Sequence, residues 1–158
     1  MGSKSASDYL LKYWDKRLPV DVEAIADAAG VSVVRRFPDG DESLSGIYTL
    51  SEDEGPVIQV NPEDNPSRQR FTIAHELGHH ALRHGRSFRD PSKNFSSSAF
   101  DPREVAANRF AAAILMPKDL VEFLIFRKGI TDIDALRSYF SVSRTAMTYR
   151  LRNLGLVD

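Results

Sequence analysis

The chain has 158 residues, 42% of them hydrophobic and 27% charged, with 21 basic and 22 acidic side chains and a net charge of −1. This length and composition suit one compact globular domain, and the balanced charge gives no reason to expect nucleic acid or an anionic membrane as a partner of the whole chain. The absence of cysteine excludes disulfides, cysteine–zinc sites and a thiol nucleophile.

The first third of the chain predicts two helices and a small sheet. A short amphipathic helix is expected near residues 5–16, and a second is expected between Asp21, a good N-cap, and Gly30, a residue type that commonly ends a helix. Segments rich in β-branched residues, separated by turn residues, then predict three strands. These strands are expected at 31–37, 45–50 and 56–61.

Helical periodicity dominates the remainder of the chain. One stretch, 85–100, is rich in serine and has neither a helical nor an alternating pattern, so it predicts a long loop. Together these elements place a three-stranded N-terminal sheet before a helical C-terminal part. Helices are expected at 67–83, 102–115, 117–127, 132–140 and 143–154.

No sequence feature directs the chain to a membrane. The longest apolar run, 110–116, is far shorter than the ~20 residues that cross a bilayer. The N-terminal residues lack the continuous apolar core of a signal peptide, and Ala6 stands where a myristoylation signal needs Ser or Thr. We therefore expect a cytoplasmic protein that has no membrane partner.

Residues 75–79, His-Glu-Leu-Gly-His, form an H-E-x-x-H pattern within the predicted helix at 67–83. Histidines four residues apart lie on one helix face, so His75 and His79 can bind the same metal ion. Glu76 lies about 100° around the helix, beside the metal, where its carboxylate can accept a proton from water. The pattern also arises by chance, but all four histidines fall between 75 and 84 on an apolar helix, which favours a metal site.

The other two histidines are poor candidates for the third ligand that a catalytic zinc requires. His80 lies about 100° from His79 around the helix, and His84 lies about 180° from His75 if the helix continues. A structural role, or a role in contact with a ligand histidine, is expected for both.

Glu104, at the start of the predicted helix 102–115, is the better third ligand. A charged glutamate beside so apolar a helix is costly to bury without a partner, and a metal ion would be that partner. The alternative is that Glu104 only stabilises the N-terminus of its helix, with Asp101 as the cap. Asn108 follows one turn later on the same face and is expected to orient a ligand histidine.

These motifs together resemble the ImmA/IrrE family of bacterial and phage metallopeptidases. The most specific are Arg-Phe-Thr-Ile-Ala-His-Glu-Leu-Gly-His at 70–79 and the helix at 104–117. Weaker matches lie at 19–26 and 57–61, and the segments at 140–143 and 150–156 complete the resemblance, which covers nearly the whole chain.

The resemblance implies a single zincin-like domain of the α+β fold class, in which His75, His79 and Glu104 hold one zinc ion and Glu76 is the catalytic residue. It implies a peptidase core at 19–128, a helical extension at 1–18 and a helical C-terminal subregion at 129–158 with an end like a helix-turn-helix. Related zinc peptidases often carry Asp where this chain has Asn108, and a neutral amide raises the basicity of a histidine less than a carboxylate does.

The activity implied by the resemblance is zinc-dependent hydrolysis of a peptide bond in another protein, a helix-turn-helix repressor, so that cleavage relieves repression. A further donor should stabilise the oxyanion, and Tyr48, Arg70 and His84 are the candidates for this substrate contact. An extended substrate is expected to pair with a sheet edge, with the loop at 85–100 covering it.

Two alternatives need no cleavage. In the first, residues 134–151 form a DNA-binding helix-turn-helix whose phosphate contacts come from Arg144, Arg150 and Arg152. Arg137 and Ser141 occupy positions where such motifs prefer Ala and Gly, so direct DNA binding is not expected. In the second, the chain is a protein-interaction module that keeps the metal and cleaves little.

Overall fold

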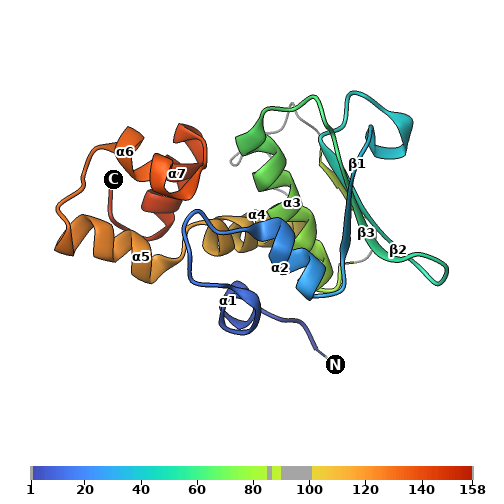
Figure 1. The fold of residues 1–158 in the computed structure, drawn as a ribbon, viewed down its shortest axis with the longest axis horizontal. Coiled ribbons are helices and arrows are strands. Elements are labelled where there is room, and N and C mark those ends of the chain that lie inside the picture. The colour runs from blue at the N-terminus through green and yellow to red at the C-terminus, as the bar shows by residue number, and fades with distance from the viewer. Residues whose placement is uncertain (1, 85–86, 90–100, 158) are drawn as a thin grey trace.

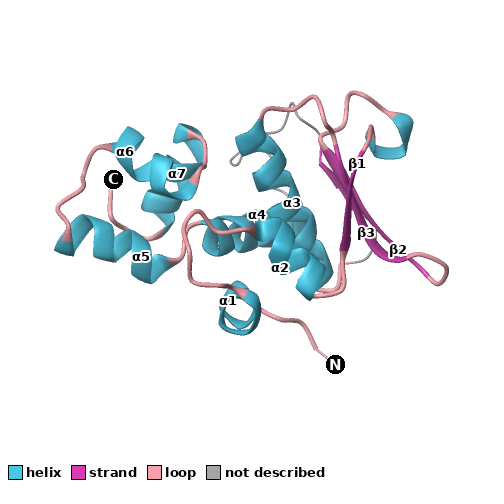
Figure 2. Cartoon of the chain, viewed as in Figure 1, coloured by secondary structure: helices cyan, strands magenta, loops and turns pink. Residues whose placement is uncertain are grey.

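The computed structural model describes residues 2–84, 87–89 and 101–157. A sheet lies at one side of the molecule, the helices at 22–28 and 66–81 pack against it, and the C-terminal helices form a group at the opposite side of the molecule (Figures 1 and 2). The strand order is β1-β3-β2-β4, with β1 parallel to β3, and β2 antiparallel to both of its neighbours. The strands are β1 Ser32–Arg35, β2 Gly46–Ser51, β3 Gly55–Val60 and β4 Ser87–Arg89.

The predicted α+β fold is confirmed, with helix boundaries close to those expected. The helix predicted at 117–127 divides into a short α-helix and a π-helical turn, Phe123–Arg127. The α-helices are α1 Ala6–Tyr13, α2 Val22–Ala28, α3 Pro66–Ala81, α4 Pro102–Leu115, α5 Lys118–Glu122, α6 Ile133–Phe140 and α7 Arg144–Asn153.

The sheet contains a fourth strand that the sequence did not predict. Strand β4 falls inside the segment 85–100, which was predicted to be a loop, and the rest of that segment lies outside the described residues. Three residues are too few to show an alternating pattern, and the strand exists because it pairs with β2 in the register Ile47 to Phe88. Strands β1 and β4 form the two edges of the described sheet.

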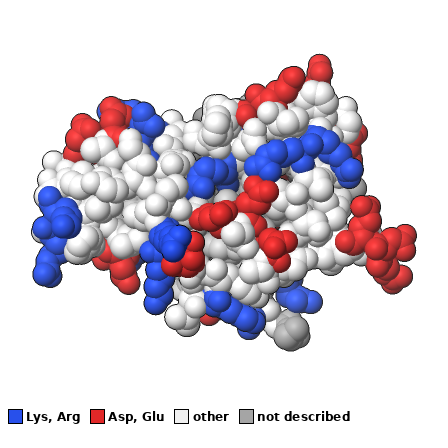
Figure 3. Space-filling view, in the orientation of Figure 1, with Lys and Arg blue, Asp and Glu red and all other residues white. Residues whose placement is uncertain are grey.

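Basic and acidic side chains are interspersed over the face of the molecule shown in Figure 3. The largest acidic group on this face lies at the turn between β2 and β3, where residues 52–54 are Glu-Asp-Glu. Among the described residues, no helix has the length and apolarity needed to cross a membrane.

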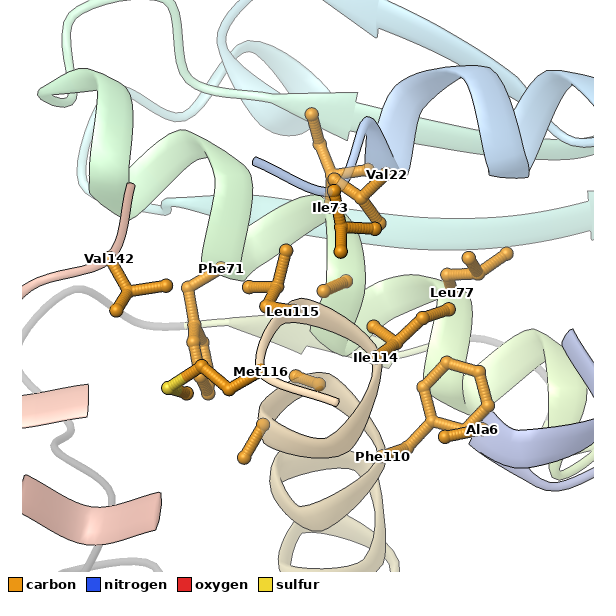
Figure 4. Packing of buried hydrophobic residues seen from close by; sticks show 14 of the residues in the cluster. Ala6, Val22, Phe71, Ile73, Leu77, Phe110, Ile114, Leu115, Met116 and Val142 are labelled. Atoms are coloured by element: carbon orange, nitrogen blue, oxygen red, sulfur yellow. The ribbon is translucent and has the colours of Figure 1, made fainter. Parts of the chain in front are cut away.

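The core lies between α3 and α4 and extends in both directions from them. Phe71, Ile73 and Leu77 of α3 meet Ile114 and Leu115 of α4, and all five side chains are buried (Figure 4). The same cluster continues into the sheet, into the N-terminal helices and into the C-terminal helices. These further members include Val60, Ala6, Val22, Met116, Phe140, Val142 and Met147.

Two arginines attach the C-terminal helices to the rest of the chain. The guanidinium of Arg70, in α3, donates hydrogen bonds to the carbonyl oxygens of Val20 at 2.8 Å, Phe140 at 3.0 Å and Ser141 at 3.2 Å. Arg150, in α7, donates from Nε to the carbonyl of Met116 at 3.0 Å. Segments far apart in the sequence are therefore joined by cationic donors that satisfy backbone carbonyl groups.

Candidate metal centre

Helix α3 places its chemically active residues on the buried side of the helix. Asn65 caps it by accepting a hydrogen bond from the Arg68 backbone at 2.9 Å, and Pro66 occupies the first turn, where a missing N–H costs nothing. His75, Glu76 and His79 are each no more than 1% exposed. Such polar groups are costly to bury without partners, so their contacts indicate what the site does.

Gly78, between the two histidines, allows α4 to lie unusually close to α3. A Cβ atom at this position would lie 3.2 Å from the Cβ and Cδ1 atoms of Phe110 and 3.3 Å from the Cα atom of Ala107. Ordinary carbon–carbon contacts are ~3.5–4.0 Å, so a larger residue would push the helices apart. The glycine therefore permits the approach that brings the first turn of α4 to the histidines.

Three potential ligands converge at this crossing, namely His75, His79 and Glu104. His75 Nε2 lies 2.7 Å from Glu104 Oε2, His79 Nε2 lies 3.2 Å from Glu104 Oε1, and the two Nε2 atoms are 3.2 Å apart. Two atoms bound to one tetrahedral zinc at about 2.0–2.1 Å lie roughly 3.3 Å from each other. Two of the three distances are close to this value, and the donor set therefore fits a single metal ion.

The carboxyl group of Glu104 is held in its charged form. Burial raises its pKa, but hydrogen bonds from His75 and His79 and the charges of these rings lower it more, so that the pKa lies well below its usual range. A carboxylate that stays ionised beside two imidazole nitrogens is a suitable oxygen ligand for a divalent cation. Capping of α4 belongs to Asp101, whose side chain accepts a hydrogen bond from the Arg103 backbone at 3.0 Å.

The ring nitrogens that face away from the cluster also have partners. His75 Nδ1 lies 2.8 Å from Asn108 Oδ1, as expected for an amide that orients a ligand. His79 Nδ1 lies 2.8 Å from His84 Nδ1. Both histidines therefore have one nitrogen held by a neighbour and the other, Nε2, directed at Glu104.

Glu76 is buried beneath the first residue of β2. A Cβ atom added to Gly46 would lie 3.7 Å from Glu76 Cγ and would clash with Thr72 Cγ2. Glycine at the start of β2 thus lets the strand cross α3 directly over the glutamate. Glu76 therefore lies close to the sheet, on the helix that carries both histidines.

His84 reaches His79 because α3 ends earlier than the sequence indicated. The helix was predicted to continue to residue 83, which would have turned His84 away, but it ends at Ala81 and Arg83 adopts a left-handed conformation with φ of 63°. The chain then folds back. Arg83 is not a glycine, so the sequence carried no signal of this reversal.

The structure gives other partners to the three candidates for a substrate contact. The Tyr48 hydroxyl lies 2.7 Å from His80 Nδ1 and is buried, and burial raises its pKa. Arg70 binds the three carbonyl groups described above. His84 faces the Nδ1 side of the His79 ring, opposite the nitrogen that faces Glu104. An oxyanion role for any of them therefore stays a prediction.

Known proteins with a similar sequence are metallopeptidases. A family model described as the IrrE N-terminal-like domain, Peptidase M78, matches residues 26–152. The chain is 29% identical to the metallopeptidase ImmA of Bacillus subtilis, over 90% of this chain and 89% of ImmA. It is 36% identical to the radiation response metalloprotease IrrE of Deinococcus deserti, over 62% of this chain and 36% of IrrE. The chain thus spans about a third of the length of that relative.

A solved structure described as a Mycobacterium tuberculosis transcriptional regulator has a similar fold. The TM-score is 0.51 and the sequences are 24% identical, over 82% of this chain and 38% of that one. At this level of identity the similarity supports the fold alone.

Proposed function

Because the chain belongs to the IrrE N-terminal-like peptidase family, we propose that it is a zinc-dependent endopeptidase. His75, His79 and Glu104 hold one zinc ion. The observation that carries this proposal is the convergence of two imidazole Nε2 atoms and one ionised carboxylate within 2.7–3.2 Å of one another. Two nitrogen ligands and one carboxylate oxygen form a donor set typical of catalytic zinc.

In this proposal Glu76 is the catalytic base. A bound zinc ion supplies Lewis acidity, which polarises a peptide carbonyl and makes water easier to deprotonate. The Glu76 carboxylate accepts the proton of the attacking water and returns it to the leaving amine. Glu76 lies close to Gly46 at the start of β2, and Asn108 orients the His75 ring.

We propose a protein substrate, specifically a helix-turn-helix repressor that is inactivated by cleavage, and therefore a cytoplasmic site of action. The family resemblance implies this substrate class, and the match to metallopeptidase ImmA over nearly the full length of both chains supports peptide hydrolysis. An extended substrate segment can pair with the outer edge of β4, which follows closely after His84. The peptidase core is assigned to 19–128, with extensions at 1–18 and 129–158.

Direct DNA binding is the less well supported function. Of the three arginines that were candidates for phosphate contacts, Arg150 binds the Met116 carbonyl and Arg144 Nη1 pairs with Asp134 Oδ2 at 2.9 Å. A DNA-binding face needs several basic groups available to phosphate. The mixed charges on the face in Figure 3 also do not form a broad basic surface there.

The test is zinc content and cleavage measured on the same variants. We expect about one zinc per chain in the wild type and in Glu76→Gln, and loss of zinc in Glu104→Ala. Purified repressors encoded near the gene are then incubated with each protein, and mass spectrometry identifies any cut. We expect cleavage by the wild type and none by Glu76→Gln. If the wild type holds zinc and cuts no repressor, the endopeptidase proposal is wrong and an interaction module that holds metal takes its place.

A further inference from the structure

We propose that His84 is a positioning residue for the metal centre, because its Nδ1 atom accepts a hydrogen bond from His79 Nδ1–H and so fixes the direction of the His79 ring. This inference rests on the proposed zinc site. It assigns to His84 a role that differs from both metal binding and substrate contact, since its ring lies on the side of His79 opposite Glu104.

The chain reversal after α3 holds His84 against His79 at two points. The backbone N–H of His84 donates to the carbonyl of His79 at 2.8 Å, while the side chains meet Nδ1 to Nδ1 at 2.8 Å. The ring centroids are 5.0 Å apart and the ring planes cross at 61°, which is an edge-on rather than a stacked arrangement. A residue tied to its partner through both backbone and side chain has little freedom to place the ring elsewhere.

The chemistry of two facing nitrogens decides which one donates. Only one proton can lie between two nitrogen atoms 2.8 Å apart in a hydrogen bond. A neutral imidazole that offers the lone pair of Nε2 to a metal carries its proton on Nδ1, so His79 must be the donor. His84 is then the acceptor and carries its own proton on Nε2.

His75 has the equivalent arrangement with a different acceptor. Its Nδ1 atom lies 2.8 Å from Asn108 Oδ1, and a ligand histidine must donate there for the same reason. Each ligand histidine is thus oriented by one neutral acceptor, the first from α4 and the second from the turn after α3. Loss of such an acceptor typically weakens metal binding by about 10–100-fold.

The experiment measures zinc affinity by chelator competition in His84→Ala, His84→Asn and His84→Gln. Asparagine places Oδ1 the same number of bonds from Cα as histidine Nδ1, whereas the acceptor of glutamine is one bond further out. We expect His84→Ala and His84→Gln to bind zinc about 10–100-fold more weakly than the wild type. We expect His84→Asn to recover most of that loss.

His80→Ala is the matched control, because the His80 ring binds Tyr48 and not a ligand histidine. It should lower the melting temperature of the metal-free protein and leave zinc affinity unchanged. The inference is overturned if His84→Ala binds zinc as tightly as the wild type, or if His84→Asn binds it as weakly as His84→Ala. If the wild type itself binds no zinc, the proposed function fails and this inference fails with it. If the wild type binds zinc but no protein is cut, the His84 comparison still stands.

Discussion

The close crossing of α3 and α4 makes Gly78→Ala a sensitive test of how the site is built. The added methyl group would lie 3.2 Å from Phe110 and 3.3 Å from the Ala107 backbone, so α4 must retreat by a few tenths of an ångström to restore ordinary contacts. Glu104 lies on α4 less than one turn before Ala107 and moves with it. Ligand distances at a zinc site tolerate only about 0.2 Å.

The added methyl group of Gly78→Ala should affect both the folding stability and the zinc affinity. Overpacking a close contact costs about 1–3 kcal/mol, while replacing glycine by alanine inside a helix returns about 1 kcal/mol. Unfolding of the metal-free protein should therefore become easier by at most about 2 kcal/mol, or a few degrees in melting temperature. Zinc binding requires α4 to move back against the overpacked contact, so the overpacking cost of about 1–3 kcal/mol opposes binding. Because about 1.4 kcal/mol corresponds to a tenfold change in affinity, zinc affinity should fall by about 5–150-fold.

Chelator competition gives the affinity, and thermal unfolding of the metal-free protein gives the stability. Gly78→Ser is a second variant for comparison, because its side chain is one oxygen atom larger than that of alanine and should weaken zinc binding further. A folded Gly78→Ala protein whose zinc affinity stays within twofold of the wild type would refute the argument that this glycine sets the distance between Glu104 and the histidines.

Three further predictions concern stability. Arg70→Lys should lower the free energy of unfolding by about 2–4 kcal/mol, because one ammonium group cannot replace three guanidinium hydrogen bonds to separate carbonyl groups. Urea denaturation measures this free energy, and an unchanged denaturation midpoint would contradict the prediction. Gly46→Ala should lower the melting temperature, because the added methyl group clashes with Thr72 Cγ2. Adding Thr72→Ser to this variant removes Cγ2 and should restore part of the lost melting temperature. If the double variant melts no higher than Gly46→Ala, the strain lies elsewhere. Burial raises the pKa of Tyr9 to about 12, so the neutral phenol stabilises the fold fully below pH 10, and this stabilisation is lost between pH 10 and about 12. Tyr9→Phe should therefore reduce the loss of folding stability at alkaline pH. A plot of unfolding free energy against pH that is identical to the wild-type plot would contradict this.

The parts of the fold that the sequence predicted well depend on local patterns. Two local patterns predicted the helices α3 and α4 and their buried faces, namely the spacing of His75 and His79 and the apolar run after Glu104. The structure brings these three residues together. The N-cap of α4 at Asp101 was likewise readable from local chemistry.

The parts that were missed depend on contacts between distant segments or on backbone conformation without a residue signature. Strand β4 is three residues long and is defined by its pairing with β2. The turn that returns His84 to His79 uses a positive φ at an arginine, where glycine would have been the usual signal. The carbonyl bonds of Arg70 were also not predicted, because their acceptors belong to residues 50–71 positions away in sequence.

The three bonds of Arg70 also limit how the chain can be divided. The C-terminal helices resemble a detachable unit in Figure 1, and a boundary near residue 128 is attractive for making a shorter enzyme. Removing residues 129–158 would delete two of the three carbonyl acceptors and leave the Arg70 guanidinium with only the Val20 carbonyl of the three. A chimeric protein that takes these helices from a relative would have to keep the backbone carbonyl groups of residues 140 and 141 in the same position. The side chains of those two residues could differ, because Arg70 binds only their backbone.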